Sequence, residues 1–218
     1  MGFGIKLEVW GDYALFTRPE MKVERVSYDV ITPSAARGII EAIYWKPAIK
    51  WVIDKIYVCN KIQFTNIRRN EVSVKISKSN AKALMNGSKL VDFINTNEQR
   101  QQRASLVLKN VRYIIEAHFE MTDKAGNDDT VEKHYNIALR RLRLGQCYHA
   151  PCFGCREFPA NFRLVENDNI ETNYSGEQDL GFMLYDMNFS DSDNIHPVFF
   201  RAKMKDGVID LKNIAKMG

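Results

Sequence analysis

Histidines are the first candidates for chemistry near neutral pH, because imidazole titrates there without help from its surroundings. The chain has four of them, and His134 is the most informative because it follows Lys133 at the start of a basic segment with a helical pattern. Unpaired N–H groups and the helix dipole favour an anion there, such as a scissile phosphate. Adjacent helical residues point about 100° apart, so the two side chains would approach a phosphate from two sides. A solvated pair on a helix surface is the alternative interpretation.

A second candidate is Tyr44, which the pattern places in the last turn of an earlier helix, two residues before Lys46. A phenol is a poor base at its unperturbed pKa of about 10, although nearby cations would lower that pKa. A core or rim aromatic is the alternative for Tyr44 on the residues alone.

Basic side chains that could hold the phosphates of a nucleic acid are concentrated in the segment from Glu132 to Gln146. This segment carries Lys133, Arg140, Arg141 and Arg143 against one acid, which is a better footprint for phosphate than the mild net charge of the whole chain. Outside it, Arg37, Arg68 and Arg69 could each pair with a phosphate, and each alone could equally be a solvated charge.

A cysteine-containing loop raises the alternative of a zinc-stabilised nucleic-acid module, because thiolates and imidazole are the ligands that zinc prefers. Its candidates are Cys147, His149, Cys152 and Cys155. They crowd into one short loop, whereas structural zinc sites combine two separated pairs. Neither a glycine-rich phosphate loop nor the acidic cluster of a two-metal nuclease is visible. We therefore predict no metal site and no cofactor.

The bulk composition indicates an ordinary globular protein. The chain has 218 residues, a net charge of +4, 45% hydrophobic residues and 27% charged residues, which predicts a real core. No window approaches the roughly 18 apolar residues of a membrane span, and no leader pattern begins the sequence. Four cysteines do not suggest a disulfide framework. We expect a cytoplasmic protein with free thiols.

Hydrophobic periodicity predicts the elements that must position these residues. Thr32 and Pro33 begin a helix that ends before Pro47, and a capping box of Asp129 and Glu132 begins a second helix that ends at Gly145. Alternation and β-branched runs predict strands at 4–10, 51–59, 62–67, 72–76, 111–121, 162–165, 182–189 and 198–204, and a hairpin at Asp206-Gly207. The polar region from Ser77 to Gln102 reads as an insertion that becomes ordered around a partner.

This order of elements predicts an α+β fold: a ferredoxin-like or RNA-recognition-motif core with insertions, followed by a small antiparallel β domain. We place the RNA-binding and catalytic domain at residues 1–146 and the small β domain at residues 147–218.

Several long blocks give the chain a resemblance to a known family. They are ERVSYDVITPSAARGIIEAIYWKP (24–47), NIRRNEV (66–72), RQQR (100–103), EKHYNIALRRLRLGQC (132–147) and GCREF (154–158). Together they resemble the fifth Cas family in its subtype I-C (Dvulg) form, in the expected order and over nearly the whole chain. Departures fall in the loop after Gly145, where Ala150 and Cys152 replace bulkier residues.

The resemblance implies a metal-independent endoribonuclease that cuts CRISPR repeat hairpins and stays in the type I-C surveillance complex. It implies a catalytic set of Tyr44, Lys133 and His134, with Tyr44 or His134 as base and the other as acid or orienter. The basic residues Arg37, Lys46, Arg68, Arg69, Arg140, Arg141 and Arg143 would contact the RNA. Its partners would be repeat RNA and the other complex subunits, with double-stranded DNA as a further candidate. A non-catalytic subunit that grips the 5′ handle of the guide RNA is the alternative.

Overall fold

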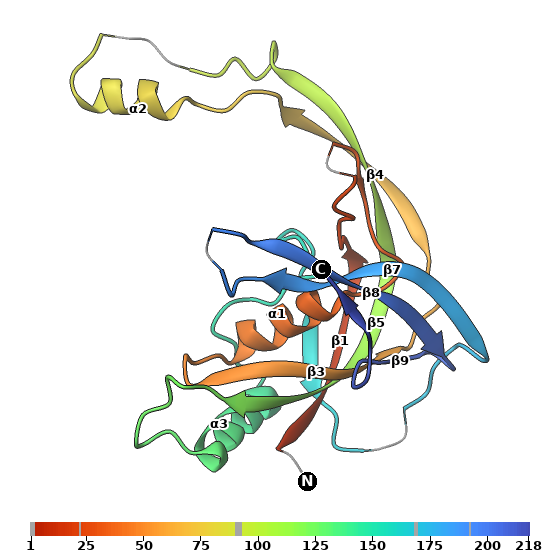
Figure 1. Ribbon diagram of the computed structural model, residues 1–218. Coiled ribbons are helices and arrows are strands. Elements are labelled where there is room, and N and C mark those ends of the chain that lie inside the picture. The colour runs from red at the N-terminus through yellow and green to blue at the C-terminus, as the bar shows by residue number, and fades with distance from the viewer. Residues whose placement is uncertain (1–2, 22, 90–92, 168–169, 192) are drawn as a thin grey trace.

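The computed structural model describes residues 3–21, 23–89, 93–167, 170–191 and 193–218. Over these residues the chain forms one large, mostly antiparallel sheet, with two helices beside its centre and an arm that projects from one end (Figure 1). The helices are α1 (Pro33–Ile43), α2 (Lys78–Met85) and α3 (Val131–Leu144). The strands are β1 (Gly4–Ala14), β2 (Arg25–Val26), β3 (Ile49–Val58), β4 (Phe64–Val72), β5 (Arg100–Met121), β6 (Asn161–Leu164), β7 (Glu177–Asn188), β8 (His196–Lys205), β9 (Val208–Asp210) and β10 (Lys216–Met217).

The sheet is organised around β5, which is 22 residues long. Its path runs β10-β8-β9-β3-β5-β1-β6, while β2 and β4 pair with the first half of β5 and β7 pairs with β8. Because β6 pairs with β1 and β9 pairs with β3, the sheet continues across residue 146. The division into two domains at that residue stays a prediction.

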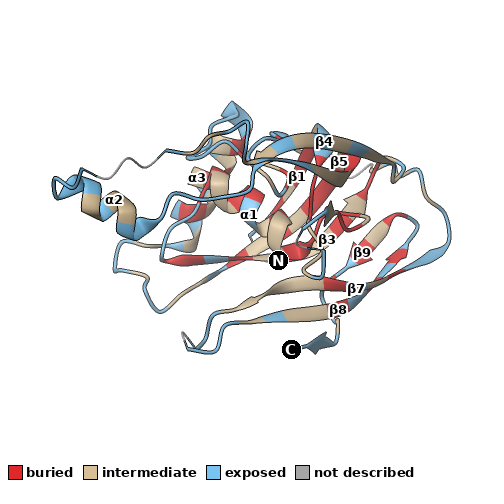
Figure 2. Ribbon diagram, turned by 90° about the horizontal axis from the view of Figure 1, so that it is seen from above, coloured by how far each residue is buried: buried red, intermediate tan, exposed pale blue. Residues whose placement is uncertain are grey.

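The alternation predicted for β5 is confirmed. The odd-numbered side chains from Val111 to Phe119 are buried and face the core, where α1 and α3 pack, and Arg112, Ile114, Glu116 and His118 lie on the opposite face. Figure 2 shows the buried residues concentrated along the central strands and the helices beside them. The face of the sheet that carries Arg112 is called the open face below.

Local signals set both ends of the two core helices. Thr32 Oγ1 accepts the N–H of Ala35 at 3.2 Å ahead of Pro33, as predicted. At α3 the predicted capping box is wrong, because Thr130 is the N-cap and its hydroxyl accepts the N–H of Lys133 at 3.2 Å. This leaves the Asp129 carboxylate available for other contacts. Gly145 ends α3 at a φ of 63°, a left-handed conformation that glycine adopts without strain.

The arm consists of β4, the first half of β5 and α2 (Figure 1). The predicted strand at residues 72–76 is wrong, because β4 ends at Val72. Beyond that point Ser73 still bonds to Gln99, with its N–H to the carbonyl and its hydroxyl to the side-chain oxygen, each at 2.9 Å. Helix α2 lies in the predicted insertion and has no buried residue. Residues 90–92 of that insertion lie outside the described residues.

The C-terminal hairpin is confirmed, with Asp206 and Gly207 at φ values of 50° and 79° between the paired residues Lys205 and Val208. Among the described helices, none combines the length and the apolar character that crossing a membrane would require.

Candidate active site

The ends of the two core helices bring a tyrosine and a histidine into direct contact. Tyr44 directly follows α1 and His134 lies in the first turn of α3, and the distance from Tyr44 Oη to His134 Nδ1 is 2.7 Å. The two residues are 90 positions apart in the sequence. Tyr44 is 2% exposed and His134 is 1% exposed. The surface interpretation of His134 is therefore wrong.

The backbone and the neighbouring rings hold Tyr44 in place. Its N–H closes the last turn of α1 on the Ile40 carbonyl, and its own carbonyl accepts the indole N–H of Trp51, on β3, at 2.8 Å. The guanidinium of Arg141 lies 5.2 Å from the centre of the phenol ring and donates to the Ile43 carbonyl at 2.7 Å. The end of α1 is thus tied to β3 and to α3 at once.

The carboxylate of Asp129 lies against the outer side of His134 and connects it to Lys133. Asp129 Oδ1 lies 3.2 Å from His134 Nε2 and 3.2 Å from Lys133 Nζ. The Lys133 ammonium also donates to the Asp128 carbonyl at 3.0 Å. Although Asp129 is close, His134 Nε2 lacks a well-directed hydrogen bond within the described part of the chain. A carboxylate therefore occupies the place beside Lys133 and His134 where a ligand anion would bind.

Asp129 is the site residue that the sequence analysis missed. The Gly126 N–H donates to its Oδ2 at 3.0 Å, and hydrogen bonds from Gly126 and Lys133 hold the pKa of this carboxyl below its ordinary value. Asp129 is therefore an anion at neutral pH.

The protonation of Tyr44 follows from its burial. Burial raises the pKa of this phenol, and the nearby Arg141 cation offsets only part of the effect. Tyr44 is therefore neutral at physiological pH and can donate its proton to His134 Nδ1. With Nδ1 accepting, the imidazole carries its own proton on Nε2, toward Asp129. This tautomer is assigned from the hydrogen-bond partners, since it leaves no buried donor of Tyr44 unpaired.

The other basic residues predicted to bind RNA are spread over the surface. Lys46, Arg68 and Arg140 are exposed, at the end of α1, on the arm and on α3 respectively. Arg143 pairs with Glu166 at 3.0 Å.

Two further arginines make contacts within the fold. Arg37 forms two bonds with Asp186 of β7, at 2.5 and 3.0 Å. Arg69 pairs with Glu157 and lies over the ring of Phe158, with 5.4 Å from the guanidinium carbon to the ring centre. Of the seven predicted RNA-binding residues, all of which the structure describes, Arg141 alone contacts Tyr44 directly. Lys46 lies two residues after Tyr44 in the sequence.

The zinc alternative finds no support in the geometry. Cys147, Cys152 and Cys155 are free thiols. Within the residues that the structure describes, His, Cys, Asp and Glu side chains form no group of three or more that could hold a metal ion.

Comparison with known proteins gives consistent matches. The family model described as CRISPR-associated protein (Cas_Cas5), in its Cas5d form, matches residues 4–212. The CRISPR pre-crRNA endoribonuclease Cas5d of Mannheimia succiniciproducens is 54% identical over 213 residues, which cover 95% of this chain and 94% of that protein. The protein of the same name from Thermus thermophilus is 37% identical over 224 residues, covering 95% of this chain and 90% of the relative. A solved structure described as a CRISPR-associated protein superimposes with a TM-score of 0.69 at 25% identity, over 96% of this chain and 92% of that one.

Proposed function

Because the chain belongs to the Cas5d family of CRISPR-associated proteins, we propose that it is a metal-independent endoribonuclease that cleaves CRISPR repeat hairpins in precursor guide RNA. After cleavage it remains with the guide in the type I-C surveillance complex. One observation carries the catalytic part of this proposal. Tyr44 and His134, from two distant segments, form a buried pair, and the Asp129 carboxylate connects His134 to Lys133.

The fold of the core supports the proposal that the protein binds RNA. In chain order, β1, α1, β3, β5, α3 and β6 alternate as strand, helix, two strands, helix and strand. The four strands lie in the order β3-β5-β1-β6 and all their pairings are antiparallel. This arrangement supports a ferredoxin-like core of the RNA-recognition-motif type, with the arm and the C-terminal strands as additions.

The reaction that suits these residues is attack by a ribose 2′-hydroxyl on the adjacent phosphorus. It would leave a 2′,3′-cyclic phosphate on one fragment and a 5′-hydroxyl on the other. The raised pKa of Tyr44 makes this residue unsuited to removing a proton. We therefore assign the proton transfer to His134 and the orientation of the imidazole ring to Tyr44. With RNA bound, the ring proton of His134 would lie on Nδ1, facing Tyr44 Oη, so that Nε2 takes the proton of the 2′-hydroxyl as its oxygen attacks. The imidazolium formed in this way then gives a proton to the 5′-oxygen as that oxygen leaves.

Lys133 supplies the charge that the transition state needs. Its ammonium and the His134 Nε2–H both approach the Asp129 carboxylate within 3.2 Å. A phosphate that displaces this carboxylate would be held by the same two groups, and Lys133 would stabilise the negative charge that develops on the phosphorane. Loop movement that withdraws Asp129 is thus part of substrate binding.

RNA would be held by the exposed basic residues around this site and along the arm. Lys46 follows Tyr44 in the loop between α1 and β3, Arg140 lies on α3, which carries His134, and Arg68 lies on β4. Contacts with the phosphate backbone would position the hairpin, and its shape and unpaired bases would provide specificity. The arm, whose helix α2 buries no residue, would contact RNA or a neighbouring subunit.

A non-catalytic subunit that grips the 5′ handle of the guide RNA is the second candidate function. The near-complete burial of Tyr44 and His134 favours it, because a pair that never opens to the substrate would only stabilise the fold. The two functions differ in whether the isolated protein cuts RNA.

The test of cleavage is incubation of the protein with repeat hairpin RNA in the presence of EDTA. We expect cutting to proceed at an unchanged rate, because the proposed groups need no divalent ion. The downstream product should carry a 5′-hydroxyl, detected by direct labelling with polynucleotide kinase. A requirement for a divalent cation, or a 5′-phosphate on that product, would contradict the mechanism.

Replacing Tyr44 by phenylalanine removes only the hydroxyl that holds His134. We expect the single-turnover cleavage rate at saturating RNA to fall by up to about 10²-fold, because a misoriented imidazole reacts poorly, while RNA affinity stays the same. The matched control is Tyr57→Phe, which removes a phenol hydroxyl bound to Glu116 at 2.9 Å on the open face. A Tyr44→Phe protein as fast as the control would show that the contact with His134 does not orient a catalytic group.

A further inference from the structure

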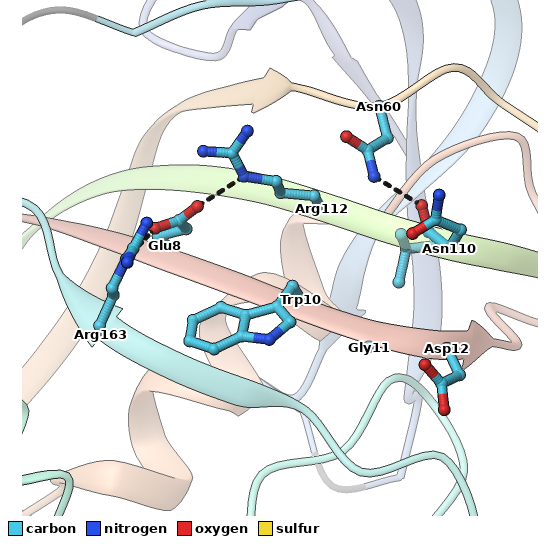
Figure 3. Close-up of a pocket in the computed structure, with 9 residues that line it drawn as sticks. Glu8, Trp10, Gly11, Asp12, Asn60, Asn110, Arg112 and Arg163 are labelled. Carbon is cyan, nitrogen blue, oxygen red and sulfur yellow. Dashed lines mark hydrogen bonds and ion pairs between the residues drawn. The ribbon is translucent and has the colours of Figure 1, made fainter.

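A cavity of about 300 Å³ lies on the open face of the sheet, away from the two core helices (Figure 3). Its lining includes Glu8 and Trp10 of β1, Asn110 and Arg112 of β5, Arg163 of β6, and Asn60 from the loop after β3. Glu8 and Trp10 alternate along β1 with the fully buried Leu7 and Val9. The cavity therefore lies on the face opposite the core.

Two guanidinium groups are fixed at one end of this cavity. The Nε–H of Arg112 donates to Glu8 Oε1 at 2.5 Å, and the Nε–H of Arg163 donates to Glu8 Oε2. The Glu8 side chain is 5% exposed, whereas those of Arg112 and Arg163 are 42% and 66% exposed. Burial raises the pKa of Glu8, but the hydrogen bonds from Arg163 and Arg112 together outweigh burial. The pKa therefore lies below its ordinary value, and Glu8 is an anion at neutral pH.

This arrangement leaves anion-binding capacity unused. Each arginine donates its Nε–H to Glu8. In the described parts of the chain, no terminal nitrogen of either guanidinium donates a hydrogen bond to another residue. At this end of the cavity two cations face one carboxylate, and the second acid of the lining, Asp12, lies at the other end (Figure 3). Guanidiniums held in this way are suited to a phosphate, which accepts several such hydrogen bonds.

An aromatic surface and amide groups lie beside these cations. Figure 3 shows the Trp10 ring lying along β1 between Arg163 and Asp12. The Arg163 guanidinium carbon is 5.6 Å from the centre of this ring. Asn60 Nδ2 donates to the Asn110 carbonyl at 2.9 Å. Among the residues that the structure describes, none bonds to the Asn60 side-chain oxygen or to the Asn110 side-chain amide, so both can face a ligand.

We propose that this cavity binds one nucleotide of a single-stranded RNA segment, with its base stacked on Trp10 and its phosphate held by Arg112 and Arg163. Stacking on an aromatic ring beside a cation is how proteins hold unpaired bases. The inference rests on the proposed function, because it takes RNA as the ligand. It assigns a second contact to that RNA, outside the hairpin that is cut.

The position of the cavity separates it from the Tyr44–His134 pair. Arg112 and Phe119 are seven residues apart on β5, about 23 Å at the rise of a strand, and Phe119 is the β5 residue beside His134. A neighbouring cavity of about 610 Å³ shares Glu8, Arg112 and Arg163. A third of about 360 Å³ shares residues 164–166 with the second and reaches Arg143 on α3. These cavities outline a path around the β6 edge by which one RNA strand could contact both sites.

The test compares two repeat RNAs, one with single-stranded flanks and one trimmed to the hairpin, in binding titrations by fluorescence anisotropy. We expect Trp10→Leu to weaken binding of the flanked RNA by about tenfold or more, because stacking of one base contributes about 1–3 kcal/mol and 1.4 kcal/mol is tenfold. Binding of the trimmed hairpin should not change. Phe182→Leu is the matched control, since Phe182 is an aromatic of β7 that is 58% exposed.

A second variant tests the phosphate contact. Arg163→Met should reduce the slope of log affinity against log salt for the flanked RNA by about 1, because one phosphate contact is lost. Unchanged binding of both RNAs by both variants would overturn the proposal, as would an equal loss for both RNAs. Failure of the parent protein to cut RNA would overturn only the proposed function, since this site is measured by binding.

Discussion

Replacing His134 by glutamine is expected to slow cleavage of the repeat hairpin by about 10²- to 10⁴-fold, the usual contribution of a general acid or base. The glutamine amide can still accept the Tyr44 hydrogen bond, but it cannot transfer a proton. The rate should be measured under single-turnover conditions with saturating RNA, so that binding and product release do not enter. RNA affinity should stay close to that of the parent.

The control for this change is His118→Gln. His118 is also bound through Nδ1, to Asp54 at 2.8 Å, but it lies on the open face and its side chain is 34% exposed. We expect this variant to cut at the parent rate. The melting temperatures of both variants, compared with that of the parent protein, show whether a slower rate comes from the loss of a catalytic group or from unfolding. If His134→Gln cuts as fast as the parent, or loses affinity in parallel with rate, His134 is structural and the handle-binding function is favoured.

The parts of the fold that could be predicted from the sequence have strong local signals. Helix α1 has a cap and a proline at its start, and its buried residues recur at helical spacing. The long alternation in β5 predicted which face is buried, because successive side chains of a strand point to opposite faces. The Asp206-Gly207 turn has the two positive φ values that such a hairpin requires.

The burial of His134 was harder to predict, because the basic residues after it suggest a surface helix. One signal was present: His134, Ala138 and Leu142 follow one another at intervals of four, and all three are buried. Residues spaced in this way share one face of a helix. His134 therefore belongs to the stripe that packs on the sheet, where it meets Tyr44.

The role of Asp129 was missed because its sequence context fits a helix cap. Thr130 next to it can also cap the helix, and the sequence does not say which of the two does so. The contact of Asp129 with Lys133 and His134 depends on the path of the loop between Gly126 and Thr130. Loop geometry of this kind is set by tertiary contacts.

Contacts between distant strands were also beyond the sequence. Glu8 and Arg163 are 155 positions apart, and they meet only because β6 pairs with β1. The arm was predicted incorrectly at residues 72–76 for a related reason. Pairing of β4 with β5 ends at Val72, and the β-branched Val74 and Ile76 beyond it resemble a strand but pair with no strand among the described residues. Propensity for a strand is a weak guide where no neighbouring strand is available.

The central claim is that a ribose 2′-hydroxyl of the RNA attacks the phosphorus, with His134 and Lys133 assisting. A single 2′-deoxy substitution at the nucleotide before the scissile phosphate tests it most directly, because it removes the attacking group and leaves every protein residue in place. We expect the substituted hairpin to bind with the affinity of the unmodified RNA and to give no product, in EDTA and in its absence. An RNA with the deoxy substitution one nucleotide further downstream should be cut normally. Cleavage of the RNA that lacks the attacking hydroxyl, at the same bond, would contradict the account.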